Sequence, residues 1–274
     1  MTPKLTAEEL MQALSLELYE EEQLRAKVSR FSKTAQLLLI TTIISFVLIN
    51  IFLPQTLVIS AVLVLITGLV FAIAHVNKQN FNKKFKVNII HKLIQLRYPE
   101  LSYYPQGSFP LDLLIKANRF NAFRGLNGLN AQDTIEGRIA GAEIKMTEVR
   151  NVTGLNRKSM PAQESSIDTG IFKGLVMSVD FFEKDIKKLE NIMHSTAVQA
   201  QIKALDEFWG SYPQITVTED AYILIDISLI KGRSFLEASK KDKLFNSSYF
   251  EGLVNQLDLL LQIPVLIKEE LDKR

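Results

Sequence analysis

The residues of this chain predict an α+β membrane protein with a two-helix transmembrane hairpin and a cytoplasmic domain that has a mainly antiparallel sheet and flanking helices. Thr34 to Asn77 contains no Asp, Glu, Lys or Arg, and Pro54-Gln55-Thr56 divides this stretch into two apolar runs. The chain that follows has pairs of alternating apolar segments without a regular alternation of strands and helices, which is typical of an α+β fold. We expect three parts: an N-terminal cytoplasmic amphipathic helix in residues 1–34, the hairpin in 35–76 and the cytoplasmic α+β domain in 77–274.

The segment before the hairpin predicts a helix over residues 5–31. Thr6 is followed three residues later by Glu9, which is the spacing of a capping box, and leucines recur at helical intervals after it. Acidic residues dominate the first half and basic residues the second, as the helix dipole favours. We expect the apolar stripe of this helix to pack on the protein's own cytoplasmic domain. A self-association or partner helix is the alternative.

The two apolar runs, 35–53 and 57–76, each contain thirteen Leu, Ile, Val or Phe residues. At a helical rise of ~1.5 Å per residue each run is roughly 28–30 Å long, which matches the hydrocarbon core of a bilayer. Thirteen such side chains favour insertion by on the order of 4–8 kcal/mol per helix. A signal peptide is excluded, because a charged segment of more than thirty residues comes first. The lipid bilayer is therefore the first predicted partner.

Basic residues flank the two runs, whereas the turn between them carries no charge. Because positive residues stay on the cytoplasmic side, both termini are expected in the cytoplasm. The residues predicted to lie at the membrane interface are Arg30, Lys33, Lys78, Lys83 and Lys84.

Gly68 and Ala72 form a small-xxx-small pair in the second run, which lets another helix approach closely. They are the candidate helix-packing residues, either between protomers or between the two helices of the hairpin.

The α+β domain begins with a continuation of the second membrane helix to about Pro99, a connector to Pro110 and a short helix over 111–118. A helix over 197–210 ends at Gly210. Strands that alternate in hydropathy are expected over 134–140 and 142–152 around Gly141, over 170–182, and over 214–218 and 221–229 around Glu219-Asp220.

The last helix of the domain is predicted to open at a second capping box. Ser248 and Glu251 have the required spacing, and the apolar residues that follow recur at helical intervals. Pro264 predicts the start of a further short helix.

Residues 136–144 read Glu-Gly-Arg-Ile-Ala-Gly-Ala-Glu-Ile, and this segment is similar to the paired-strand signature of a bacterial family, the domain of unknown function 3137 (DUF 3137). Further similar residues are Glu148, Phe172-Lys173-Gly174-Leu175, Asp180-Phe181, Phe235, Glu237 and Ser239, whereas His194-Ser195 and Gln199-Ala200-Gln201 depart from the pattern. The resemblance covers roughly residues 80–265. It implies a bacterial inner-membrane protein with one or two membrane helices and an α+β domain, and it implies no catalytic residues.

Composition and motifs exclude several classes of function. The 274 residues carry a formal net charge of only +2, whereas a nucleic-acid-binding protein usually has a concentrated basic face. The absence of cysteine excludes a disulfide framework, a thiolate zinc site and a cysteine nucleophile. No phosphate-binding loop, zinc-protease motif or nucleophile elbow is present, and the three histidines are far apart in sequence. We therefore expect no nucleic-acid partner, no cofactor and no metal.

Four polar residues are unusual, because several of them lie within apolar strands: Glu148, Asp180, His194 and Asp226. They could form a general acid–base or metal site only if they converge in one cleft. The alternative is that strand alternation turns them to solvent.

These observations favour a non-enzymatic function: a membrane-anchored cytoplasmic scaffold or interaction module that contacts a protein partner or forms a homo-oligomer. One alternative is a membrane-tethered enzyme with an unrecognised acid/base site. The other is a subunit of a small membrane transport complex.

Overall fold

The computed structural model describes residues 4–52, 57–116, 131–150, 173–229, 235–238 and 243–273. They divide into two compact units. The helical unit contains Thr6–Ile89 with Glu237–Phe250, and the α+β unit contains Ile90–Leu236 and Glu251–Arg274 together with the residues before Thr6.

The helical unit begins with α1 (Ala7–Ala13) and continues with the long helices α2 (Ser15–Phe52) and α3 (Leu57–Phe85). The predicted capping box is confirmed: Glu9 N–H donates to Thr6 Oγ1 at 3.2 Å, and Thr6 N–H donates to Glu9 Oε2 at 2.7 Å. The two helices predicted over 5–31 and 35–53 are not separate. After a break at Leu14, α2 runs without interruption from the charged N-terminal residues into the first apolar run, because no Pro or Gly separates them.

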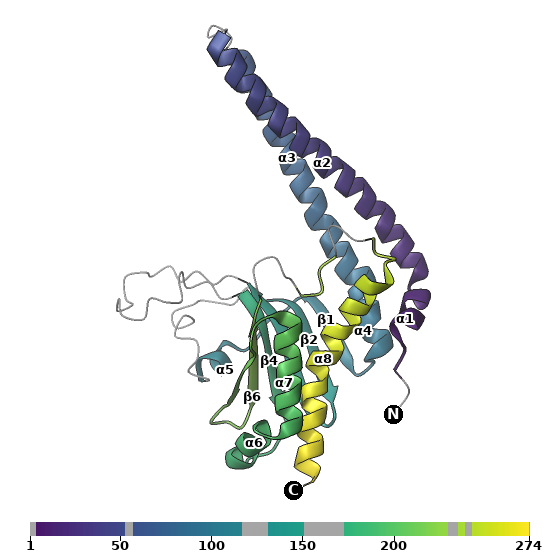
Figure 1. Ribbon diagram of the computed structural model, residues 1–274, viewed down its shortest axis with the longest axis vertical. Helices are drawn as coiled ribbons and strands as arrows, with labels where there is room; N and C mark the ends of the chain where they lie inside the picture. Colours follow the sequence, from purple (N-terminus) through teal and green to yellow (C-terminus); the bar gives the residue numbers. More distant parts are fainter. Residues whose placement is uncertain are drawn as a thin grey trace, which may run out of the picture. The chain divides into compact units, whose positions relative to one another are not determined.

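Helices α2 and α3 pack as an antiparallel pair (Figure 1). Glu21 of α2 is hydrogen-bonded to Asn88, just after the end of α3, and Thr42 of α2 to Thr67 of α3. The residue numbers of these partners therefore decrease as those on α2 increase, which is the order of an antiparallel pair. Within the apolar runs the buried side of the pair consists of small residues, whereas large apolar side chains elsewhere on both runs are exposed. The buried small residues are Ala35, Thr42, Thr67 and Ala74.

Three helical stretches among the described residues are long and apolar enough to cross a membrane: Ser15–Leu48, Ala61–Arg97 and Ser247–Asp272. The most apolar window is only 11% buried within the protein in each of the first two, but 50% buried in the third. The candidate spans indicate a multi-pass membrane protein that contacts the lipid bilayer.

The α+β unit is built on a six-stranded sheet in the order β1-β2-β3-β4-β6-β5, in which all neighbours are antiparallel. Both predicted hairpins are confirmed. Ala140 and Gly141 connect β2 to β3 with φ of 51° and 79°, the pattern of a two-residue type I′ turn. The strands are β1 (Leu101–Gln106), β2 (Ala131–Ile139), β3 (Ala142–Arg150), β4 (Lys173–Asp180), β5 (Gln214–Val217) and β6 (Ile223–Ser228).

The helices of this unit are short except for two, α7 and α8, which lie side by side along the sheet (Figure 1). Gln201 Nε2 of α7 donates to the Leu259 carbonyl of α8 at 2.6 Å. Gly210 ends α7 in the left-handed conformation, as predicted. The helices are α4 (His91–Arg97), which follows the π-helical turn Lys86–Ile90, then α5 (Leu111–Lys116), α6 (Ile186–Met193), α7 (Thr196–Trp209) and α8 (Ser247–Asp272).

Three predictions for this part of the chain were wrong. The connector before Pro110 contains strand β1, which tolerates Pro105 because an edge strand needs fewer ladder bonds. Pro264 does not start a new helix: α8 continues through it, since its buried apolar stripe extends on both sides. Asn246 caps α8 in place of Ser248, because its Oδ1 accepts from Ser248 N–H at 3.1 Å.

Candidate functional site

The four residues predicted as a possible acid–base site do not converge. Glu148 on β3 pairs with Leu175 of β4, whereas Asp226 on β6 pairs with Val176, the next residue of that strand. Paired residues share a face and successive residues alternate, so the two carboxylates project from opposite faces of the sheet.

Asp180 and His194 lie apart from both. Asp180 is on the same face as Asp226, but it follows Val176 by four residues, which is about 13 Å along a strand. Its Oδ1 accepts from Phe182 N–H at 2.7 Å. His194 is exposed and forms the C-cap of α6.

Glu148 belongs instead to a buried cluster that the sequence did not indicate. Tyr103 donates from its hydroxyl to Asp133, and Phe235 N–H donates to Glu148 Oε2 at 3.3 Å. Burial raises the pKa of Tyr103 far above its usual range, and the Asp133 carboxylate and then the Glu148 charge raise it further. Asp133 and Glu148 are both fully buried, and this cluster is part of the core of the α+β unit.

Asp133 reaches Tyr103 because β2 is irregular at this point. The register of β2 against β3 shifts between Gln132 and Ile135, and Asp133 has a φ of 54°. Asp tolerates this left-handed conformation better than most residues. A bulge of this kind leaves no signal in hydropathy alternation, so the sequence alone does not place Asp133 in a buried cluster.

A second polar network joins α4 to α8 within the α+β unit. Arg97 forms a bidentate ion pair with Asp258, with Nε–Oδ1 at 3.0 Å and Nη2–Oδ2 at 2.5 Å. Tyr98 donates its hydroxyl to Asp258, and Arg97 also donates to the Leu5 carbonyl. Lys4 Nζ lies 4.5 Å from the centre of the Tyr98 ring. The side chains of Arg97 and Tyr98 both donate to partners within the α+β unit, which indicates that this network is structural.

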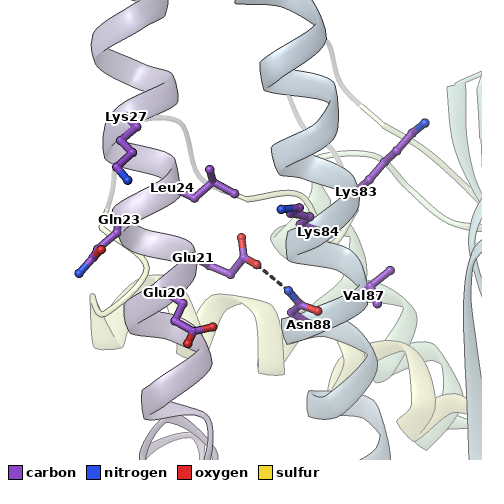
Figure 2. A pocket seen from close by; sticks show the side chains of 9 residues that line it. All are labelled: Glu20, Glu21, Gln23, Leu24, Lys27, Lys83, Lys84, Val87 and Asn88. Carbon is purple, nitrogen blue, oxygen red and sulfur yellow. Dashed lines mark hydrogen bonds between the residues drawn. The ribbon is translucent and has the colours of Figure 1, made fainter.

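A cavity of about 600 Å³ opens between α2 and α3, entirely within the helical unit. Five of its nine lining residues are charged, and these include Lys83 and Lys84 of the predicted membrane interface. Figure 2 shows Glu21 extending from α2 toward α3, and Lys83 extending away from α2. The lining residues are Glu20, Glu21, Gln23, Leu24, Lys27, Lys83, Lys84, Val87 and Asn88.

Glu21 is the least exposed charged residue of this cavity, with 4% of its surface accessible. Its Oε1 accepts from Asn88 Nδ2 at 2.7 Å (Figure 2). Its Oε2 is buried and has no hydrogen-bond partner among the described residues. A buried acceptor of this kind destabilises a protein by roughly 1–3 kcal/mol unless a donor reaches it.

Unlike Glu21, the neighbouring Glu22 has hydrogen-bond partners for both of its carboxylate oxygens. Its two carboxylate oxygens accept from Arg25 at 2.7 and 2.8 Å, and Oε2 also accepts from Leu244 N–H at 3.0 Å. Within the described part of the chain, no ion pair joins the cavity's lysines to Glu20 or Glu21. The lining residues therefore carry three ammonium groups and two carboxylates that form no ion pair with one another in the described part of the chain, and the Lys83 side chain extends away from α2.

The remaining predicted residues lie on the surface of the helical unit. Arg30, Lys33, Lys83 and Lys84 are exposed and Lys78 is half-buried. Gly68 and Ala72 are exposed too, and a Cβ added at Gly68 would meet nothing within 4 Å. Thr67 and Ala74, not the predicted pair, make the buried contact with α2.

No group of three or more His, Cys, Asp or Glu that could hold a metal ion occurs among the described residues. No protein-family model, curated protein or solved structure matches this chain. The candidate site therefore rests on the geometry of the α2–α3 cavity alone.

Proposed function

We propose that this protein is a membrane-anchored cytoplasmic interaction module that acts through contacts and catalyses no reaction. The observation that carries the proposal is the exposure of the two uncharged helical runs. They are long enough to span a bilayer, their windows are only 11% buried, and they precede a compact α+β unit. The basic residues on both flanks favour a cytoplasmic position for both termini, in the inner membrane that the resemblance to DUF 3137 implies.

In this proposal α8 does not cross the membrane. Half of its most apolar window is already buried within the protein, and Asp258 near its middle forms an ion pair with Arg97. A helix whose apolar stripe is covered by protein gains little from lipid.

Cysteine accessibility tests this topology directly, because the chain contains no cysteine and each introduced thiol is unique. We expect a membrane-impermeant maleimide to label Q55C in intact spheroplasts, and K203C and K273C only after permeabilisation. K203C and K273C bracket α8, so labelling of these two from opposite sides would show that α8 crosses the membrane. Labelling of K203C from outside would overturn the proposed orientation.

Self-association is the contact that the hairpin itself supports. Gly68 and Ala72 face away from α2, which leaves a small-residue surface where a second copy's helix can approach. Crosslinking in native membranes should yield oligomers that G68L abolishes and that I66L, a control at an exposed position of the same helix, leaves intact. Oligomers that persist in G68L would show that this surface is not the contact, and recovery of monomer alone, with no partner, would contradict the interaction module.

A further inference from the structure

The cavity between α2 and α3 combines features that a simple packing defect does not explain. Helix packing by itself explains the hydrogen bond that Glu21 Oε1 accepts, because a polar pair such as Glu21–Asn88 fixes the register of neighbouring helices. The same packing leaves Oε2 buried, and none of the residues that the structure describes donates a hydrogen bond to it.

The charges around the cavity indicate which chemical group would suit Glu21 Oε2 as a donor. A protonated amine both donates to Oε2 and neutralises the carboxylate, and such charge-assisted bonds are among the strongest in proteins. Lys84 lies four residues before Asn88 on the same face of α3, so it sits about one helical turn, ~5.4 Å, nearer the membrane. Lys84 and Lys27 both line the cavity on the side of Glu21 that lies toward the apolar runs, and their ammonium groups favour an anionic group beside the amine.

We propose that this cavity binds a small zwitterion that carries a primary amine and a phosphate, as phosphoethanolamine does. The ammonium donates to Glu21 Oε2, and the phosphate accepts from Lys84 with support from Lys27. Binding of this ligand joins the cytoplasmic ends of α2 and α3. The same chemistry occurs in a soluble metabolite and in the head group of an ethanolamine phospholipid.

The depth of the cavity favours the soluble source, a step that rests on the proposed membrane function. The charge-free run ends at Lys33 and Lys78, twelve residues from Glu21 and ten from Asn88, which is about 15–18 Å of helix. The head-group layer on one side of a bilayer is only about 5–7 Å thick. A lipid head group would therefore have to leave its layer to reach Glu21, whereas a soluble molecule enters from the cytoplasm.

Calorimetric titration of the full chain tests the proposal, in nanodiscs of phosphatidylcholine and phosphatidylglycerol with phosphoethanolamine as the probe. We expect saturable binding that E21Q weakens at least about tenfold, because the carboxylate charge is lost while Gln keeps the contact with Asn88. K84A should weaken it as well. E8Q removes an exposed carboxylate outside the cavity and should leave binding unchanged. Phosphocholine should bind at least about tenfold more weakly, since its quaternary nitrogen has no N–H to donate.

A second arm uses nanodiscs that contain phosphatidylethanolamine and measures the lipid that the purified protein retains. Soluble binding in the first arm supports the metabolite, and E21Q-sensitive lipid retention alone supports the head group; either result supports the amine–phosphate chemistry. An absence of saturation in both arms, or binding that E21Q does not change, would overturn the proposal. Thermal melting of E21Q by circular dichroism shows that the variant is folded. A failure of the proposed topology would appear in the maleimide labelling and not in these titrations.

Discussion

Truncation of Asp258 to alanine tests the ion pair that joins α4 to α8. The carboxylate accepts three hydrogen bonds, two from Arg97 and one from Tyr98, and its loss leaves the Arg97 guanidinium with only 11% of its side chain exposed. Loss of one partner of a fully buried pair destabilises by about 3–5 kcal/mol. The Asp258 side chain is 32% exposed, so water partly replaces it, and we expect about 2–3 kcal/mol.

The single tryptophan of the chain makes this measurement specific to the α+β unit. Trp209 is 2% exposed and packs against Phe235, so its emission shifts to the red when this unit unfolds. In urea titrations with a slope of about 2 kcal/mol per molar, D258A should lower the midpoint by roughly 1–1.5 M. The double variant R97M/D258L should recover most of this loss, because it removes both charges together.

A midpoint shift below about 0.3 M for D258A would refute the reasoning, since it would correspond to the contribution of an exposed surface pair. Additivity of R97M and D258L within about 0.5 kcal/mol would refute it as well, because contacting residues should be coupled.

Three further predictions concern the α+β unit. Tyr103 stays protonated in the folded protein at pH values where an unfolded tyrosine, with a pKa of 10.0, ionises. The free energy of unfolding should therefore fall as the pH rises above about 10. In urea titrations, Y103F should reduce this fall by about 1.4 kcal/mol per pH unit. An equal slope in Y103F would contradict this. G137A should destabilise the protein by about 2–3 kcal/mol, because the added Cβ would lie 2.3 Å from the Glu100 carbonyl oxygen. G252A in α8 has open space around the added Cβ and should stabilise the protein by up to about 1 kcal/mol. Equal shifts in melting temperature for the two variants would contradict this steric explanation. D185A should lower stability by about 1 kcal/mol in the same titrations, since Asp185 Oδ1 caps α6 by accepting from Lys188 N–H at 3.0 Å, and an unchanged midpoint would show that the cap is dispensable.

Much of the fold could be predicted because its signals are local. The capping box of Thr6 and Glu9, the turn at Gly141 and the end of a helix at Gly210 each depend on residues within one turn of one another. Strand β1 escaped prediction because Pro105 argues against a strand unless the strand lies at an edge, and edge position is a property of the whole sheet.

The candidate site could not be predicted in the same way. Glu21 is one of several glutamates in an acidic stretch, and only its contact with Asn88, 67 residues away, distinguishes it from Glu20. Among the four polar residues singled out in the sequence, Glu148, Asp180 and Asp226 lie in strands, and hydropathy alternation gives the face of each residue only relative to its own strand. It does not show which faces of separate strands coincide.

The sequence by itself determined the charge-free hairpin, the antiparallel class of the domain and the basic flanks of the membrane runs, because hydropathy, length and charge act along the chain. Only the tertiary structure decided which residues meet. Antiparallel packing of α2 on α3 buries Glu21 beside Asn88 and leaves its second oxygen without a donor among the described residues, while the sheet register separates Glu148 from Asp226. The physical reason is that burial and hydrogen bonding depend on distances in space, and residues far apart in the chain come together only when helices and strands pack.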